Sequence, residues 1–301
     1  MSANWIRITG ALFALFFIAA SPAQEITVQD DAGNTVELTG PARRIISLAP
    51  HITELLFAAG AGNRIVGVVE YSDFPEQAKN IERIGNHSAI DLERVAILKP
   101  DLIIAWLSGN PKAALAKLEQ MGYPVFYSEP HTMQDIASSM LRFAALTGTQ
   151  QTARGAVNVF QDQLRQLETR YAGKPIVTVF YEIWNQPMTT VNGQHLISEV
   201  IRICGGKNVF ADLDSLAPTV AVEPVLAANP QVIIASSNDG KAPGWLSEWK
   251  AWPTLDAVRY NNLFYVDWNY INRLSPRILK GVEAVCEELQ TARQHIQLQT
   301  Q

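Results

Sequence analysis

Aromatic side chains follow predicted strands in both halves of the chain. Tyr71 comes soon after one short apolar run, and Trp106 directly follows another. Trp184 and Tyr270 occupy similar places in the second half. Aromatic rings at such positions can stack on a bulky ligand, and the amides beside them can exchange hydrogen bonds with it. Because few charges accompany these rings, the pattern favours a large and nearly neutral ligand.

Polar residues in the same loops complete the candidate site. Pro50 and His51 follow the first predicted strand of the α/β part, and Arg273 follows the last one. The Arg273 guanidinium has five hydrogen-bond donors, which suit either a ligand or a neighbouring group of the cleft. The full set of predicted ligand contacts is Pro50, His51, Tyr71, His87, Trp106, Trp184, Asn269, Tyr270 and Arg273.

The histidines argue against a bare metal ion as the ligand. A zinc- or manganese-binding protein would hold the ion with several histidines and carboxylates. His51, His87, His131 and His195 occur singly, without HxH or HxxxH spacing. Each is therefore expected to be an isolated loop residue. We predict no metal site and no cofactor of the protein's own, and a Zn/Mn-binding protein is the weaker alternative.

Motifs of common catalytic sites do not occur in the sequence. GxSxG, GxxxxGKS and HExxH are all missing. The net charge is −5, and no Lys/Arg block forms a basic stripe for nucleic acid. We therefore expect a non-catalytic, monomeric binding protein without a nucleic-acid partner.

The first residues have the features of an export signal. Arg7 precedes an uncharged apolar run, residues 8–20, and small residues follow at 21–23. The run is shorter than the about 20 residues that a membrane-spanning helix needs. We predict that residues 1–23 are a signal peptide cleaved near Ala23.

Two cysteines, Cys204 and Cys286, lie near the ends of predicted helices. An oxidising compartment would allow them to pair. Two buried free thiols are the alternative that the sequence leaves open.

Short apolar strands alternate with helices from Arg44 onward. Such alternation is typical of parallel strands in an α/β layer structure. Strands are predicted at 45–48, 65–69, 102–105, 125–127, 176–181, 232–235 and 263–266. Helices are predicted at 52–59, 92–98, 113–121, 133–146, 196–203 and 275–295, and residues 296–301 are expected to fray.

One longer helix is predicted near the middle of the chain, at 150–172. Apolar residues recur there every three or four positions from Ala153 to Tyr171, which places them on one face. Its length of roughly 35 Å matches the width of a small domain. We interpret it as a rigid spacer. The predicted organisation is an N-terminal lobe at 24–148, a connecting helix at 149–173 and a C-terminal lobe at 174–297.

The two halves also contain a repeat. Residues 92–105 align without gaps on residues 222–235, each with a short helix, a proline-marked turn and a strand. Glu93 and Glu223 are equivalent in this repeat, and each lies at a helix start, where the helix dipole favours a carboxylate. Two similar α/β lobes that face each other would enclose a cleft lined by the loops after their strands.

Four stretches resemble the periplasmic substrate-binding proteins of metal-chelate ABC importers, which carry vitamin B12, ferric siderophores or haem. They are ISLAPHITELLFAAG at 46–60, VGVVEYSDFP at 66–75, DLERVAILKPDLIIAW at 91–106 and INRLSPR at 271–277. The resemblance extends from about Arg44 to Glu288. It implies two Rossmann-like lobes joined by a single long helix, a ligand cleft between the lobes and a periplasmic location.

The motifs at 71–75, 104–110 and 273–277 are most similar to the family members that bind vitamin B12. The resemblance therefore implies cobalamin as the transported ligand, with a ferric siderophore or haem as the alternative. It also implies a Cys204–Cys286 disulfide. Glu93 and Glu223 match acidic residues that dock into arginine pockets of the inner-membrane ABC permease/ATPase complex. The sequence departs from the pattern at His87 and Asn269.

Overall fold

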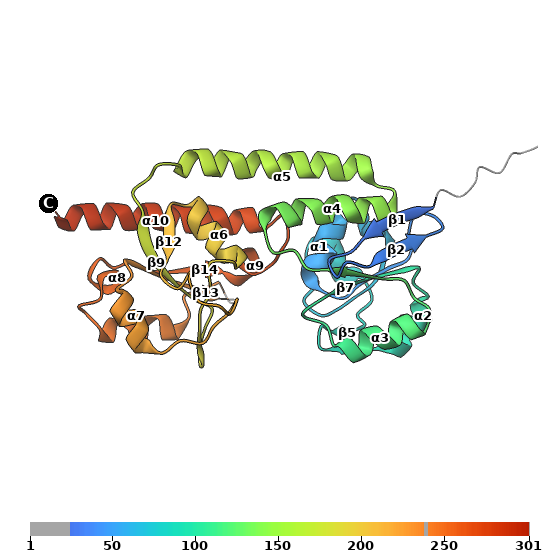
Figure 1. Ribbon diagram of the computed structural model, residues 1–301, viewed down its shortest axis with the longest axis horizontal. Helices are drawn as coiled ribbons and strands as arrows, with labels where there is room; N and C mark the ends of the chain where they lie inside the picture. The colour runs from blue at the N-terminus through green and yellow to red at the C-terminus, as the bar shows by residue number, and fades with distance from the viewer. Residues whose placement is uncertain (1–24, 238–239, 301) are drawn as a thin grey trace, which may run out of the picture.

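The computed structural model describes residues 25–237 and 240–300, so the predicted signal peptide lies outside the described residues. Two α/β lobes stand side by side, and helix α5 (Gln150–Tyr171) passes from one to the other (Figure 1). Helices α4 (Met133–Thr147) and α10 (Ile278–Thr300) lie beneath α5, one in each lobe. In the described ranges, no helix is long and apolar enough to cross a membrane.

The sheet of the N-terminal lobe has four parallel strands in the order β4-β3-β7-β8. Ile103 and Ala105 pack on one face and Leu102 and Ile104 on the other, because successive strand residues point to opposite faces. Both faces are covered by helices, as parallel sheets require. The strands are β3 (Ile45–Ser47), β4 (Ile65–Val68), β7 (Leu102–Trp106) and β8 (Val125–Ser128), and the helices besides α4 are α1 (Pro50–Ala58), α2 (Leu92–Leu98) and α3 (Lys112–Gln120).

The C-terminal lobe repeats this plan with the strand order β12-β9-β13-β14, again all parallel. Tyr181 packs toward α10, and Phe180 packs toward the opposite layer. The strands are β9 (Val177–Glu182), β12 (Gly206–Asn208), β13 (Val232–Ser237) and β14 (Leu263–Asp267), and the remaining helices are α6 (Leu196–Ile203), α7 (Val222–Ala228), α8 (Asp256–Arg259) and α9 (Trp268–Ile271).

Smaller elements decorate both lobes. Three antiparallel hairpins and three 3-10 turns complete the described structure. The hairpins are β1 (Ile26–Gln29) with β2 (Thr35–Leu38), β5 (Gly85–Asn86) with β6 (Ala89–Ile90), and β10 (Trp184–Asn185) with β11 (Met188–Thr189). The 3-10 turns are η1 (Gly62–Arg64), η2 (Glu76–Asn80) and η3 (Gly244–Ala251).

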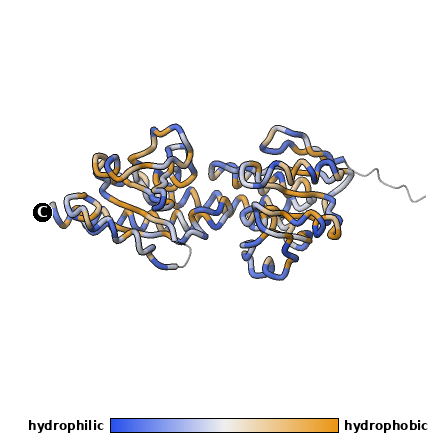
Figure 2. The backbone as a smooth tube through the Cα atoms, turned by 90° about the horizontal axis from the view of Figure 1, so that it is seen from below, coloured by the Kyte–Doolittle hydropathy of each residue, from blue (hydrophilic) through white to orange (hydrophobic). Residues whose placement is uncertain are grey.

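The apolar face of α5 connects the cores of the two lobes. Val157, Phe160 and Leu167 are buried in a single hydrophobic cluster that contains residues from both lobes. Each such side chain contributes about 1.5–3 kcal/mol when it leaves water. Figure 2 shows the hydrophobic stretches of the backbone inside each lobe, with the lobes distinct in this view. The helix α5 is therefore packed against both lobes along its apolar face and is not a flexible linker.

The repeat is visible in the backbone. Helices α2 and α7 have seven residues each, and each ends in a left-handed residue, Lys99 (φ 45°) or Asn229 (φ 42°). Pro100 or Pro230 follows, and the chain then enters β7 or β13. Because equivalent residues adopt the same unusual conformation, the two lobes are built from one local plan.

The end of the last helix differs from the prediction. The sequence predicted a helix at 275–295 with fraying beyond it, whereas α10 begins at Ile278 and continues to Thr300. Ile296 packs against the core, and the Gln299 side chain donates a hydrogen bond to the backbone oxygen of Arg259 (3.2 Å). These tertiary contacts stabilise a final turn that local sequence alone does not.

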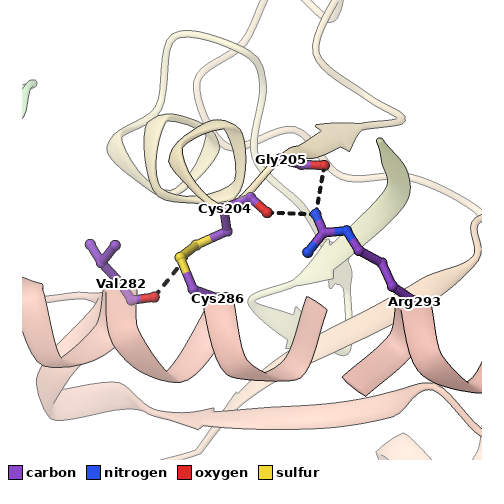
Figure 3. The surroundings of a disulfide bond; sticks show 5 residues. All are labelled: Cys204, Gly205, Val282, Cys286 and Arg293. Carbon is purple, nitrogen blue, oxygen red and sulfur yellow. Dashed lines mark hydrogen bonds between the residues drawn. A yellow bond between two sulfur atoms is a disulfide. The ribbon is translucent and has the colours of Figure 1, made fainter. Parts of the chain in front are cut away.

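The predicted disulfide between Cys204 and Cys286 is present and joins the end of α6 to α10 (Figure 3). The two residues are 82 positions apart, and closing such a loop contributes about 4.5 kcal/mol in the chain-entropy model. Arg293 of α10 reinforces this contact by donating to the backbone oxygens of Cys204 (2.7 Å) and Gly205 (3.1 Å). The last helix is thus anchored to its lobe by covalent and polar contacts.

Candidate functional site

The loops that follow strands in both lobes meet at helix α1. The Glu54 carboxylate accepts hydrogen bonds from Arg273 Nη1 (3.0 Å) and Ser275 Oγ (2.5 Å) of the C-terminal lobe. Arg277 donates to the same carboxylate from Nε (2.9 Å) and Nη2 (2.6 Å). Arg273 Nη1 also donates to Asp73 Oδ1 (2.8 Å), which follows β4. We call Glu54, Asp73, Arg273, Ser275 and Arg277 the interlobe cluster.

Apart from Asp73, whose side chain is 50 % exposed, the interlobe cluster is largely removed from solvent. The side chain of Glu54 is 2 % exposed, and those of Arg273 and Arg277 are 10 % and 15 % exposed. Buried charges are tolerated only when they are paired and hydrogen-bonded, and bidentate arginine–carboxylate contacts are the strongest of this kind. Burial lowers the pKa of Arg273, but its hydrogen bonds to Asp73 and Glu54 outweigh this effect and raise the pKa overall. The cluster therefore pairs two arginines with two carboxylates, and their formal charges cancel.

Aromatic rings surround the arginine side of the cluster. The Arg277 guanidinium lies over the Phe74 ring at 4.1 Å and near the Tyr270 ring at 5.7 Å. Lys280 Nζ lies 5.2 Å from the centre of the Tyr270 ring. These cation–π contacts hold Tyr270 of one lobe and Phe74 of the other against the same guanidinium.

Trp106 is the centre of a second group, in the N-terminal lobe. Its ring meets the edge of the His51 ring at 5.5 Å and lies 6.4 Å from His87. Its Nε1 donates to Glu129 Oε1 (3.2 Å). Asn110 accepts from the Trp106 backbone nitrogen and donates to the His87 backbone oxygen (3.0 Å), so it fixes both loops together.

The buried His51 side chain packs edge-on against the Trp106 ring. It is 6 % exposed, and its Nε2 atom is buried without a hydrogen-bond partner. Burial lowers the pKa of His51 to about 4, and the positive charge of Arg273 acts in the same direction. The imidazole is therefore neutral at neutral pH, and its edge-on contact fixes the orientation of the Trp106 ring.

Two candidate rings are open to solvent. Tyr71 is 71 % exposed, and its backbone is left-handed (φ 64°), a conformation that costs about 1 kcal/mol for a residue with a side chain. Trp184, on β10, is 56 % exposed and donates from Nε1 to the backbone oxygen of Gln186 (2.9 Å). Exposed aromatic rings at strand ends are surfaces that a ligand can cover.

The remaining candidates occupy less prominent positions. Pro50 is the first residue of α1 and is half-buried. Asn269 is also half-buried, and its backbone nitrogen donates to Asp267 Oδ1 (2.8 Å) at the start of α9. Arg273 binds within the protein, to Glu54 and Asp73. Ring contacts bring His51, His87 and Trp106 together, whereas Trp184 makes no ring contact with them in the part of the chain that the structure describes.

Sequence reasoning missed the acidic members of the interlobe cluster. Glu54 is the only charged residue of α1, and the residues around it from His51 to Leu56 are all buried. A lone carboxylate in an otherwise uncharged helix is a signal that it has a buried cationic partner. The motif at 273–277 supplies that partner from the other end of the chain.

A second buried carboxylate ends β9. Glu182 is 1 % exposed and accepts a hydrogen bond from Trp249 Nε1 (2.8 Å). Burial raises the pKa of Glu182 to about 7, with a smaller contribution from the charge of Glu248. Across residues 25–237 and 240–300, no three histidine, cysteine, aspartate or glutamate side chains form a group that could hold a metal ion.

Glu93 and Glu223 lie in equivalent places, away from the interlobe cluster. Each is exposed and is the second residue of its helix, α2 or α7. Both helices lie on the side of the molecule opposite α5 (Figure 1). The two carboxylates therefore point to solvent from different lobes of one scaffold.

Residues 45–270 match the family model described as periplasmic binding protein. The chain belongs to the periplasmic binding protein family. This periplasmic binding protein is 41 % identical over 253 residues to a vitamin B12-binding protein of Vibrio cholerae, which covers 84 % of this chain and 91 % of the relative. It is 38 % identical over 248 residues to a vitamin B12-binding protein of Yersinia pestis, with 82 % and 86 % covered.

Solved structures agree with the family. The crystal structure of a periplasmic vitamin B12 binding protein of Vibrio cholerae has a TM-score of 0.75 at 40 % identity and covers 84 % of this chain and 98 % of its own. A periplasmic haem-binding protein of Vibrio cholerae has a TM-score of 0.72 at 22 % identity, covers 82 % and 98 %, and shows the fold alone. The predicted two-lobed α/β fold and the non-catalytic binding class are confirmed.

Proposed function

We propose that the protein captures cobalamin in the periplasm and delivers it to an ABC permease. The observation that carries this proposal is the charge-balanced junction between the lobes, where Glu54 engages both arginines and Asp73 engages Arg273. A neutral corrin with amide side chains suits aromatic rings and hydrogen bonds better than fixed charge. The identity of 38–41 % to vitamin B12-binding relatives supports the same ligand.

The corrin would lie between the lobes, against rings from both of them. Tyr71 and Trp106 supply the N-terminal wall, and the loop at 269–273 supplies the opposite wall. Trp106 is held in place by Glu129 and His51, so its ring is oriented before a ligand arrives. Such preorganisation lowers the entropic cost of binding. Pro50, His87 and Trp184 complete the proposed lining.

Haem is the second candidate, because Tyr71 is exposed and a tyrosine can serve as an axial ligand to haem iron. His51 suits this role poorly, since its Nε2 atom is buried. A ferric siderophore is less favoured, because an anionic chelate requires arginines that are free to bind it.

Delivery would require recognition by the permease, and residues 1–23 would be removed on export. Glu93 and Glu223 would provide one docking carboxylate on each lobe. Oppositely charged partners of this kind fix orientation and accelerate association. The protein would act as a monomer in the periplasm, after cleavage near Ala23.

Calorimetric titration of the mature protein tests the ligand. We expect cyanocobalamin to bind tightly, and haemin and a ferric siderophore to bind more weakly under the same conditions. Micromolar or weaker binding of cyanocobalamin, beside tight binding of either other chelate, would overturn the proposal. A fold check by circular dichroism ensures that weak binding is not caused by unfolding.

A further inference from the structure

We propose that Glu54 and Asp73 determine ligand specificity by cancelling the charge of Arg273 and Arg277, so that the site prefers a neutral chelate to an anionic one. This inference rests on the proposed function and adds to it the reason for the choice of ligand. It gives the two carboxylates a role in selection besides their role in joining the lobes.

Hydrogen bonds from both arginines to the two carboxylates are the basis of the charge cancellation. Arg277 forms two hydrogen bonds with Glu54, through Nε and Nη2, so its fork of donors is occupied. Arg273 Nη1 is shared between Glu54 and Asp73. The planar face of Arg277 is covered by the Phe74 ring. A ligand carboxylate approaching this region would therefore meet guanidinium groups that already have anionic partners.

Lysines also lie near the cluster. Lys280 faces the Tyr270 ring, and Lys79 interacts with Asp73 but is itself paired with Glu76. His51, the nearest titratable group of α1, is neutral because burial lowers its pKa to about 4. Removing one carboxylate would leave a positive charge in a poorly solvated place, where its field is weakly screened.

A purely structural role for Glu54 predicts a different result. If Glu54 only joined the lobes, its loss would weaken the binding of every ligand by a similar factor. If it also cancels charge, its loss must change the ratio between ligands that differ only in charge. A matched ligand pair therefore separates the two roles.

The pair is cyanocobalamin and its monocarboxylic acids, in each of which one side-chain amide is replaced by a carboxylate. We expect the ratio of dissociation constants, acid over amide, to fall by about tenfold for at least one acid when Glu54→Gln is compared with the unmodified protein. Raising the ionic strength from 20 mM to 500 mM should reduce this change, since salt screens partly exposed charges.

Asp73→Asn provides a second variant that should fold normally, because the Asp73 side chain is 50 % exposed. We expect a smaller change in the same direction. Asp162→Asn is the matched control, since it removes an exposed carboxylate that is paired with Arg165 on α5 and makes no contact with the cluster. It changes the net charge of the protein equally and should leave the ratio unchanged.

The outcomes separate the two proposals. If the unmodified protein binds cyanocobalamin tightly but neither Glu54→Gln nor Asp73→Asn lowers the ratio more than Asp162→Asn does, the specificity inference is wrong and the proposed function stands. If the unmodified protein does not bind cyanocobalamin, the proposed function is wrong and the inference falls with it.

Discussion

Glu182 makes the stability of the protein depend on pH. Its pKa is raised to about 7 by burial and by Glu248, while an unfolded chain has the ordinary value of 4.5. The folded state therefore binds the proton more tightly, and this contribution to stability is present below pH 4.5 and lost as the pH rises to 7. Glu182→Gln cannot ionise, and its amide oxygen can still accept the hydrogen bond from Trp249.

We compare the unfolding free energy of Glu182→Gln with that of the unmodified protein. The difference, variant minus unmodified, should increase between pH 4.5 and 7. Above pH 7 the gain should reach about 1–3 kcal/mol. Urea denaturation at pH 5, 6, 7 and 8 measures it. Glu283→Gln, at an exposed position on α10, is the control and should give no such trend. A difference that is flat with pH would contradict the assignment of the proton to Glu182.

The sequence predicts where a single residue lies in the fold better than it predicts which distant residue its side chain contacts. Trp106 had to lie at the carboxyl edge of the sheet, because it follows a buried parallel strand. Glu54 and Arg273 are 219 positions apart, and no local pattern encodes that they meet. The ligand-contact roles of Trp106 and Arg273 stay predictions, whereas the pairing of Cys204 with Cys286 is confirmed.

At the scale of elements, helix α5 contains a glycine that lowers its stability. Gly155 lies in its interior, is exposed, and has no atom within 4 Å of the place that a Cβ would occupy. We expect Gly155→Ala to raise the unfolding free energy by about 0.5–1 kcal/mol, because alanine loses less conformational entropy on folding. Chemical denaturation at neutral pH measures the change.

Gly281 in α10 provides the matched comparison for Gly155. A Cβ at Gly281 would come within 2.9 Å of the backbone oxygen of Tyr270, so Gly281→Ala must displace α9 and should lower stability. The same substitution is thus expected to have opposite effects in the two long helices. If both variants lost stability, an alanine side chain at position 155 would not be accommodated without strain, and the expectation for Gly155→Ala would be wrong.

The disulfide is expected to contribute strongly to the C-terminal lobe. Replacing Cys204 and Cys286 by alanine should lower the unfolding free energy by about 2–5 kcal/mol, because the open chain gains entropy when it unfolds. Arg293 still donates to the Cys204 backbone, so the fold should persist. Reductant should destabilise the unmodified protein and leave the double variant unchanged. Equal stability of the two proteins without reductant would refute the expectation.

Periodicity explains which elements could be predicted. Helices such as α6 have the repeat of three to four residues that helix geometry requires, whereas a strand such as β9, buried on both faces, is marked by a nearly continuous apolar run. The edge strand β12 has the sequence Gly206-Lys207-Asn208, which lacks any such pattern and pairs only because β9 lies beside it. The last turn of α10 likewise depends on contacts from elsewhere in the chain.

Several contacts join the two lobes, among them a hydrogen bond from the Met133 backbone nitrogen of α4 to Glu199 Oε2 of α6 (3.1 Å). Two larger ties differ in kind. Helix α5 shares its buried face with both cores, and Glu54 joins α1 to the segment containing Arg273 and Arg277. The first tie is apolar and lies along one side of the molecule, and the second is ionic and lies at the junction of the loops. Because these ties oppose rotation of one lobe against the other, we expect the surfaces of α2 and α7 to keep a fixed separation.

That fixed separation leads to the expectation for transport. Glu93 and Glu223 are exposed, one on each lobe, so replacing both by alanine should abolish uptake of labelled cyanocobalamin in cells that supply the cognate permease. Calorimetry should find the ligand affinity of the double variant unchanged, because neither residue belongs to the interlobe cluster. Each single variant should retain part of the uptake, since one charge pair still guides association. Glu283→Gln controls for the loss of an exposed carboxylate, and normal uptake by the double variant would exclude docking through these two residues.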